Sequence, residues 1–329
     1  MTDGTVPREG ARILVFGAGS LGSLLGGLLA RTHDVTLVGR EPHVGRVREA
    51  GLRVEGELSL EVRPAAATTV PDGRYDLALV TVKAGDTAAA AEALSAAEAA
   101  ETPGGVESEA PATADTGTET GIGAVWSLQN GLGNEERLAA ALSCPVLAGT
   151  CTYGARLVEP GVVACTGVGE VTVGPAGGGA STLADTVGAA TNAAGVETTV
   201  AADMPRRLWE KLAVNAGINA VTALARVENG ALVDGPATEV ARTAARETAT
   251  AARDAGVGLD PDRVAERVTA VAETTAANVS SMRSDVEAGR PTEVDAINGA
   301  VVDRASEPVP VNETLTALVR AWEHERGLR

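Results

Sequence analysis

Short apolar runs separated by turn residues dominate the first half of the chain, and their order predicts an α/β domain. Residues 13–16 and 35–38 are β-rich runs, and leucines at helical spacing over 24–29 lie between them. Strand, helix and strand in this order are typical of a βαβ unit, whose two strands are parallel. Three further apolar runs extend the predicted sheet: 77–82, 125–128 and 146–149. Residues 162–164 and 170–173, separated by two glycines, predict an antiparallel hairpin at the sheet edge.

The pattern changes near residue 203, where the strand signals stop. Long alanine-rich stretches with interspersed Arg and Glu follow, and helical periodicity is interrupted at three Gly/Pro clusters: 235–236, 258–261 and 289–291. We therefore expect two domains, an α/β domain over 1–202 and an all-helical domain over 203–329. Within the first domain, 95–123 carries six acidic residues and no basic ones, which predicts a solvated, mobile loop.

Composition and charge narrow the class of protein. The 44 acidic and 27 basic residues leave a formal net charge of −17, which opposes binding to nucleic acid or to anionic membranes. Only two of the basic residues, Lys83 and Lys211, are lysines. This acidic, arginine-rich composition fits a salt-rich cytosol and a halophilic archaeal source. A GC-rich genome that favours Arg, Ala and Gly is the alternative explanation.

Signals for export, membrane insertion and metal binding are not evident in the sequence. The first residues show no cationic and apolar signal-peptide pattern, so we expect a cytoplasmic protein. The long apolar stretch 13–30 contains five glycines and two serines and does not predict a membrane span. Cys144, Cys151 and Cys165 lack CxxC spacing, so neither a disulfide framework nor a metal site is expected.

The glycine pattern after the first strand predicts a dinucleotide site. Gly17, Gly19 and Gly22 form G-x-G-x-x-G between strand and helix, where backbone N–H groups and the helix N-terminus bind a pyrophosphate. A tight turn without a ligand is the alternative. Arg40 stands at the end of the second strand, where an NAD site usually has an acidic residue, and a guanidinium suits the 2′-phosphate of NADPH. Glu41 follows directly, so NADPH is favoured and NADH stays open.

A polar stripe in the second domain marks a candidate catalytic helix. Lys211, Asn215 and Asn219 are spaced by four residues and share one helix face among apolar neighbours. The stripe indicates either polar groups directed into a ligand site or a buried structural network. None of the three histidines lies in a polar cluster, which leaves Lys211, if burial lowers its pKa, as the candidate proton donor. A second polar stripe is expected over 278–285.

Taken together, these segments resemble ketopantoate reductases. The likeness runs from about Arg12 to the last predicted helix and is interrupted by the acidic loop. It rests on the segments 17–22, 80–83, 129–133, 149–152, 209–219, 229–230, 278–282 and 292–299. The resemblance implies a Rossmann domain joined to an all-α domain of the 6-phosphogluconate dehydrogenase type, with substrate bound in the cleft between them.

The resemblance also implies roles for individual residues. Arg40 would bind the adenosine phosphate, Lys83 the adenosine ribose side, and Ala155 the nicotinamide amide through its backbone. Lys211 would be the general acid and contact the substrate, with Glu293 reaching the cofactor or orienting the lysine. The pyrophosphate-binding residues that it implies are Gly17, Ala18, Gly19, Ser20, Leu21 and Gly22. The substrate-binding residues that it implies are Asn130, which would also contact the nicotinamide ribose, Asn215, Asn219, Asn229 and Ser281.

The implied activity is the NADPH-dependent reduction of 2-dehydropantoate (ketopantoate) to pantoate in coenzyme A biosynthesis. Two alternatives remain: a dehydrogenase of the same fold that acts on another 2-oxo acid or an imine, and a catalytically silent NADP-sensing module. The expected partner is a small 2-oxo acid, a homodimer is left open, and neither nucleic acid, membrane nor metal binding is expected.

Overall fold

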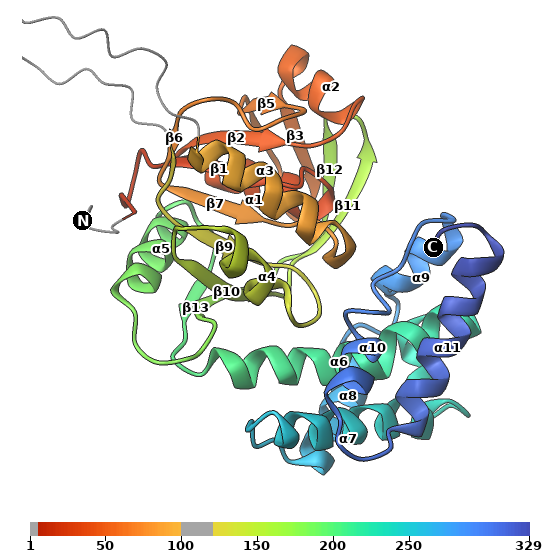
Figure 1. Ribbon diagram of the computed structural model, residues 1–329. Coiled ribbons are helices and arrows are strands. Elements are labelled where there is room, and N and C mark those ends of the chain that lie inside the picture. Colours follow the sequence, from red (N-terminus) through yellow and green to blue (C-terminus); the bar gives the residue numbers. More distant parts are fainter. Residues whose placement is uncertain (1–5, 100–120) are drawn as a thin grey trace, which may run out of the picture. The chain divides into compact units, whose positions relative to one another are not determined.

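The computed structural model describes residues 6–99 and 121–329, and the chain forms two compact units (Figure 1). The N-terminal unit comprises the chain up to Gln129 together with Asn134–Met204. The helical unit comprises Asn130–Gly133 and Pro205–Arg329. The segment Asn130–Gly133 thus belongs to the helical unit. The expected division between residues 202 and 203 had placed it in the N-terminal domain.

An eight-stranded sheet forms the centre of the N-terminal unit. β1 (Arg12–Phe16) lies between β2 (Asp34–Val38) and β7 (Leu77–Val80) and is parallel to both, as the βαβ pattern predicts. In spatial order the strands are β14 (Thr198–Val200), β13 (Val171–Pro175), β10 (Val146–Cys151), β9 (Val125–Ser127), β7, β1, β2 and β5 (Ala65–Ala67). The carboxyl ends of β7, β1 and β2 consequently lie at one edge, the place where open α/β sheets bind ligands.

A second sheet of four strands corrects the predicted edge hairpin. Its order is β11 (Gly154–Glu159), β12 (Val162–Gly167), β3 (Leu52–Gly56) and β4 (Leu60–Val62). The expected pairing of 162–164 with 170–173 was wrong, because β12 pairs with β11 and β3 whereas β13 joins the large sheet. The chain crosses between the sheets at Gly169, where a side chain would meet Thr152 at 2.5 Å. A separate pair is formed by β6 (Arg74–Tyr75) and β8 (Gly121–Ile122).

Helices flank the sheets of the N-terminal unit. They are α1 (Ser20–Leu29), α2 (His43–Ala50), the 3-10 turn η1 (Ala84–Asp86), α3 (Thr87–Ala99), α4 (Asn134–Ala141) and α5 (Thr182–Ala193). The loop expected over 95–123 was wrong at both ends, because α3 and β8 extend into it. Alanine favours helix in α3, and Leu94 anchors that helix in the core with no exposed surface. Residues 100–120, the rest of the expected loop, lie outside the described part of the chain.

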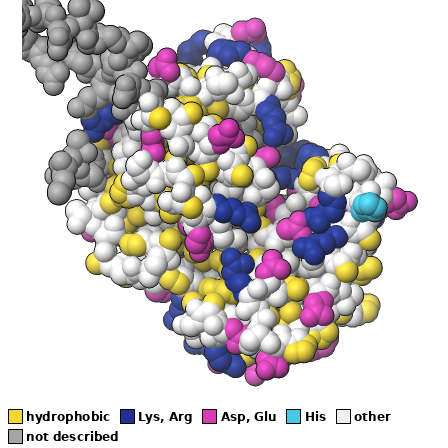
Figure 2. Space-filling model, viewed as in Figure 1, with side chains coloured by type: hydrophobic (Ala, Val, Ile, Leu, Met, Phe, Trp, Pro, Cys, Tyr) yellow, Lys and Arg dark blue, Asp and Glu magenta, His cyan; other side chains and the backbone are white. Residues whose placement is uncertain are grey.

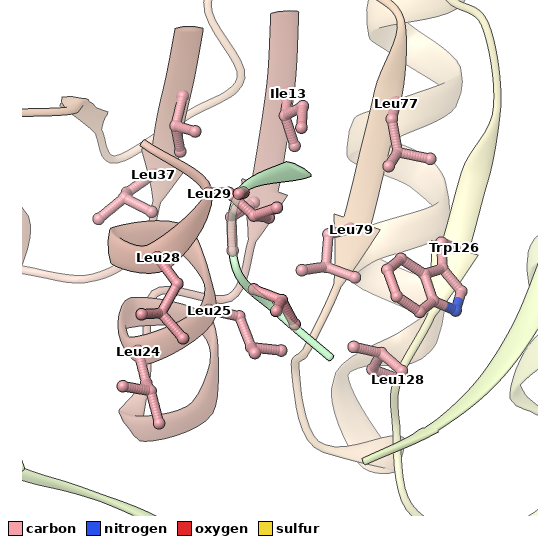
Figure 3. Packing of buried hydrophobic residues seen from close by; sticks show 14 of the residues in the cluster. Ile13, Leu24, Leu25, Leu28, Leu29, Leu37, Leu77, Leu79, Trp126 and Leu128 are labelled. Carbon is pink, nitrogen blue, oxygen red and sulfur yellow. The ribbon is translucent and has the colours of Figure 1, made fainter. Parts of the chain in front are cut away.

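Aliphatic side chains fill the core beneath α1 (Figure 3). Leu29 of α1, Ile13 of β1 and Leu79 of β7 are each at most 1% exposed. Burying a side chain of this size contributes roughly 1.5–3 kcal/mol to stability. The helix approaches the sheet closely at Gly26, where a side chain would meet Leu37 at 2.4 Å. This packing holds α1, and with it the glycine turn, against the central strands.

The C-terminal part of the chain is helical, which confirms the expected fold class. Its elements are α6 (Met204–Ala225), the 3-10 turn η2 (Asn229–Leu232), α7 (Thr238–Asp254), α8 (Pro261–Thr274), α9 (Ser281–Glu287), α10 (Asn298–Arg304) and α11 (Pro310–Glu325). Two of the three Gly/Pro clusters fall between helices, and the third ends at Pro261, the first residue of α8. Asp260 caps α8 by accepting from the backbone of Asp262 and Arg263. Fully buried alanines such as Ala244 and Ala249 let α7 pack closely. Within the described ranges, none of the helices has the length and apolarity of a membrane span.

Candidate active site

The glycine turn predicted to bind a pyrophosphate connects β1 to α1. Gly17 has a φ of +114°, and a side chain there would meet the backbone of Val82 at 2.7 Å. Gly22 faces the turn from α1, where a Cβ would lie 2.2 Å from Gly17 O. Gly19 differs, because a Cβ there would meet nothing nearer than Gly17 O at 4.0 Å. The first and third glycines are thus required by the fold, whereas the space at Gly19 is open to a ligand.

The residues between these glycines are held by neighbouring strands. Ala18 N donates to the last carbonyl of β2 at 2.8 Å, and Ser20 Oγ accepts from Leu157 N of β11 at 3.0 Å. Leu21 packs against the core. Helix α1 begins at Ser20, and its N-cap Gly19 supplies no side-chain acceptor. A helix N-terminus of this kind favours an anion.

Arg40 follows β2 and carries the guanidinium expected at the 2′-phosphate. Its Nη2 lies 3.2 Å from Asp86 Oδ2, and its side chain is 88% exposed. The neighbouring Glu41 is bonded to α2, since its carboxylate accepts from Gly45 N at 2.9 Å and from Arg48 Nη2 at 2.5 Å. Because both oxygens of Glu41 have donors within α2, this residue is a poor candidate for the acceptor of a ribose diol.

Lys83 follows β7, and a buried polar network holds the backbone around it. Gln129 Nε2 donates to Val82 O at 3.1 Å and to Thr87 Oγ1 at 2.7 Å. Thr87 Oγ1 also lies 2.9 Å from Asn134 Oδ1, and both of these side chains are fully buried. The network residues had no role in the sequence-based predictions. Gln129 belongs to a segment on which the resemblance rests, whereas Thr87 and Asn134 were marked only by their polarity. Polarity alone does not show that a side chain is buried.

Asn130 and Glu293 meet in the helical unit although they are 163 positions apart. Asn130 Nδ2 donates to Glu293 Oε2 at 3.0 Å. The segment that carries Asn130 fits closely against the loop before α10: Gly131 has a φ of +85°, and a side chain there would meet Ala296 O at 2.3 Å. Leu132 N donates to the same Ala296 O at 3.2 Å. The structure therefore brings together two residues for which separate roles were predicted.

Helix α6 carries the predicted polar stripe, which consists of Lys211, Asn215 and Asn219. Two buried contacts from other helices hold α6. Asn298 Nδ2 at the start of α10 donates to Ala216 O at 3.0 Å and to Asn312 Oδ1 at 3.0 Å. Thr222 Oγ1 lies 2.8 Å from Ser280 Oγ, the N-cap of α9. These contacts set the position of the helix that presents the lysine and the two asparagines.

The remaining predicted substrate residues, Asn229 and Ser281, have different settings. Asn229 in η2 is 7% exposed and donates from Nδ2 to Thr275 Oγ1 at 2.9 Å. Its buried Oδ1 has no hydrogen-bond partner among the described residues. Ser281 is the exposed first residue of α9, whereas Ser280 before it is buried. The second stripe expected over 278–285 was wrong at its start, because residue 278 precedes the helix.

The buried His43 has a structural setting in the N-terminal unit. His43 Nδ1 accepts from Gly161 N at 3.1 Å, so Nε2 carries the proton that it donates to Ser23 Oγ at 2.9 Å. Burial lowers the pKa of His43, which keeps the ring neutral. The ring thus joins α1 and α2 to the turn between β11 and β12. β11 also carries Ala155, the residue predicted to contact the nicotinamide amide, which pairs with Cys165 of β12.

Comparisons with known proteins find the same family along almost the whole chain. A family model described as "Ketopantoate reductase PanE/ApbA" matches residues 13–178, and "Ketopantoate reductase PanE/ApbA C terminal" matches 203–323. The chain is 44% identical over 327 residues to the 2-dehydropantoate 2-reductase of Halobacterium salinarum, covering 95% of this chain and 99% of that protein. It is 38% identical over 317 residues to the 2-dehydropantoate 2-reductase of Archaeoglobus fulgidus, covering 95% and 98%.

Solved structures show the same two-part fold. A ketopantoate reductase from Ralstonia eutropha JMP134 superposes with a TM-score of 0.81 at 31% identity, covering 96% of this chain and 99% of that one. A D-mandelate dehydrogenase with NADH and anilino(oxo)acetate superposes with a TM-score of 0.83 at 23% identity, covering 97% and 100%, which shows a shared fold. From the family models and the identity to curated relatives, the chain belongs to the ketopantoate reductase family.

Proposed function

We propose that this protein reduces 2-dehydropantoate (ketopantoate) to pantoate with NADPH. The observation that carries the proposal is the polar face of α6, which presents a lysine and two asparagines four residues apart. Relatives that are 44% and 38% identical to this chain are named 2-dehydropantoate 2-reductase. A lysine can supply a proton to a ketone oxygen, and asparagine amides can bind the carboxylate and hydroxyl groups of a small acid.

The N-terminal unit suits NADPH. The open space at Gly19 and the N-terminus of α1 fit a pyrophosphate, and the exposed guanidinium of Arg40 suits a 2′-phosphate. Lys83 binds the adenosine ribose side, and the backbone of Ala155 contacts the nicotinamide amide. When bound, the reduced nicotinamide supplies the hydride that the ketone carbon accepts.

Lys211 supplies the proton in this proposal. Its ammonium stabilises the negative charge that develops on the ketone oxygen and then protonates that oxygen, so the product is a 2-hydroxy acid. Glu293, which accepts a hydrogen bond from Asn130, orients the lysine. The substrate-binding side chains are Asn130, Asn215, Asn219, Asn229 and Ser281.

The test is a substrate comparison. Oxidation of NADPH is followed at the nicotinamide absorbance band with ketopantoate and with a series of 2-oxo acids that differ in branching and in the 4-hydroxyl group. We expect kcat/KM to be highest for ketopantoate and higher with NADPH than with NADH. A higher kcat/KM for another 2-oxo acid would assign a different substrate, and cofactor binding without turnover of any acid would indicate a sensing module.

We also propose that the protein works in a salt-rich cytoplasm. The formal net charge is −17, and Figure 2 shows acidic and basic side chains scattered over the drawn face. Several arginines are paired with acids, such as Arg246 with Glu239 at 2.8 Å and with Asp262 at 3.2 Å. Salt shortens the Debye length from roughly 30 Å at 0.01 M to roughly 3 Å at 1 M, which screens the repulsion among the unbalanced carboxylates.

Thermal unfolding in buffers of increasing KCl concentration tests this second proposal. We expect the melting temperature and the activity to rise steeply between dilute buffer and molar KCl. A melting temperature that stays constant or falls over this range would favour genome composition as the reason for the arginine bias.

A further inference from the structure

An ion pair spans the carboxyl end of β1 in the N-terminal unit. Arg40 follows β2, Asp86 ends the turn η1 that follows β7, and Arg40 Nη2 lies 3.2 Å from Asp86 Oδ2. β1 pairs with both β2 and β7, and its own carboxyl end carries the glycine turn. The ion pair therefore lies at the sheet edge where the adenosine ribose of a dinucleotide binds in folds of this class.

Asp86, and not Glu41, is the carboxylate bonded to the guanidinium of Arg40. Glu41 follows Arg40 in sequence, but its two oxygens accept from Gly45 N and from Arg48. The side chains of Arg40 and Asp86 are 88% and 49% exposed, so an incoming nucleotide can reach both. Asp86 had no role in the sequence-based predictions, because it lies 46 positions from Arg40 in the chain.

We propose that Asp86 competes with the 2′-phosphate of the cofactor for Arg40 and thereby sets how strongly the enzyme prefers NADPH over NADH. The inference rests on the proposed function, since it takes Arg40 as the reader of the 2′-phosphate. It adds a specificity-determining residue that acts through Arg40.

The chemistry of the two cofactors differs at this position. A 2′-phosphate carries close to two negative charges at neutral pH and has acceptor oxygens only, so it and the Asp86 carboxylate compete for the N–H donors of the Arg40 guanidinium. Asp86 then faces a charge of its own sign. The 2′-hydroxyl of NADH can donate a hydrogen bond to a carboxylate, so NADH binds without breaking the ion pair between Arg40 and Asp86. Asp86 therefore lowers the affinity for NADPH but does not lower that for NADH.

The expected size of the effect follows from the exposure of the pair. An exposed ion pair is weak, and its loss corresponds to about a two- to fivefold change in an equilibrium constant. Removing the guanidinium itself should matter more, because a charge-assisted hydrogen bond to a phosphate corresponds to about ten- to hundredfold in affinity.

The experiment measures dissociation constants of NADPH and NADH by calorimetry, without any oxo acid, for the wild type and for four variants. Asp86→Asn removes the charge and keeps the shape, Arg40→Ala removes the guanidinium, and the third variant combines both. Glu61→Gln is the matched control, because it removes an exposed carboxylate of the same unit on β4. Binding of 2′,5′-ADP and of 5′-AMP repeats the comparison with the 2′-phosphate as the variable group.

We expect Asp86→Asn to raise the NADPH-to-NADH affinity ratio about two- to fivefold, with Glu61→Gln at the wild-type ratio. In the Arg40→Ala background the gain from Asp86→Asn should be smaller, because only the direct repulsion between Asp86 and the 2′-phosphate is then removed. An unchanged ratio for Asp86→Asn alone, or an equal gain without Arg40, would overturn the inference. A wild type that binds neither nucleotide would overturn the proposed function as well, whereas inactivity towards ketopantoate would leave the affinity ratios to be judged on their own.

Discussion

The two units present their candidate ligand residues in different ways. In the N-terminal unit the backbone forms the candidate pyrophosphate site, because Gly17 and Gly22 have no room for a side chain and Gly19 leaves open space. In the helical unit the candidate site consists of side chains. Some of them lie on α6, and the others are Asn130 and Glu293, which are joined by a hydrogen bond. A backbone site depends on residue size and φ, whereas a side-chain site depends on functional groups. We therefore expect glycine substitutions to impair folding and cofactor binding together, and α6 substitutions to impair turnover with the fold intact.

The largest expected effect is on turnover, at Lys211. Lys211→Ala should lower kcat by about 10²–10⁴-fold, the usual contribution of positioned acid catalysis, while NADPH still binds. Lys211→Arg is the matched control, because it keeps the charge but does not donate a proton near neutral pH. We expect this variant to stay nearly as slow as the alanine variant. Turnover near the wild-type value in either variant would remove Lys211 from the mechanism.

Substitutions in the glycine turn should lower stability and cofactor binding, unlike those at Lys211, which should lower turnover. Gly17→Ala forces a Cβ against the backbone of Val82 at a φ of +114°, and we expect a loss of about 2–4 kcal/mol in unfolding free energy together with weaker NADPH binding. Gly177→Ala is the control, because a Cβ there meets nothing within 4 Å. Chemical denaturation and cofactor titration measure both effects. If Gly17→Ala were as stable as Gly177→Ala, the backbone argument for this unit would fail.

The buried networks behind the two sites allow a matched pair of variants. Gln129→Leu leaves Val82 O and Thr87 Oγ1 without their buried donor, and Asn298→Leu does the same for Ala216 O. Each should cost about 1–3 kcal/mol in stability. We expect Gln129→Leu to raise KM for NADPH several-fold, because it loosens the backbone before Lys83. Asn298→Leu should instead raise KM for ketopantoate and lower kcat, since it loosens α6. The same kinetic change in both variants would contradict separate roles for the two networks.

A smaller effect is expected from pH, through His43 in the N-terminal unit. Burial lowers its pKa below the ordinary value of 6.5, so the unfolded chain binds a proton that the folded ring does not. The contribution of the neutral, buried His43 ring to the unfolding free energy is therefore complete above pH 6.5 and is lost as the pH falls below that value. The unfolding free energy changes by at most about 1.4 kcal/mol per pH unit through this group. His43→Gln should be less stable at neutral pH but should lose less stability on acidification. Denaturant unfolding at a series of pH values checks this, and parallel curves for the two proteins would count against it.

Local sequence patterns were sufficient where the determinants lie close together in the chain. The glycine turn follows a β-rich run and precedes leucines at helical spacing, and the structure has β1, the turn and α1 in this order. The spacing of Lys211, Asn215 and Asn219 follows from helix geometry, and one helix carries all three. The Gly/Pro clusters fall at the boundaries of helices, because proline is tolerated in the first turn of a helix but not in its interior.

The partners of these elements could not be predicted in the same way. The apolar run of β12 suits either sheet, and its pairing with β3 joins segments more than 100 positions apart, so the expected hairpin with β13 was wrong. The burial of Gln129 and Asn298 was equally hidden, because a polar residue in the sequence carries no sign of what covers it. The alternation and spacing of apolar residues predict the helix or strand to which a residue belongs, but not the helix or strand that packs against it.

The sequence alone determined the fold class, the family and the residue types of the candidate site, since these depend on short motifs and on resemblance along nearly the whole chain. Only the tertiary structure decided which of these residues meet. Asn130 donates to Glu293, which is 163 positions away in the chain. Arg40 pairs with the distant Asp86, whereas the adjacent Glu41 accepts from the backbone of α2. The physical reason is that a hydrogen bond or an ion pair acts over about 3 Å, and the packing of helices and strands, not separation along the chain, sets which groups come that close.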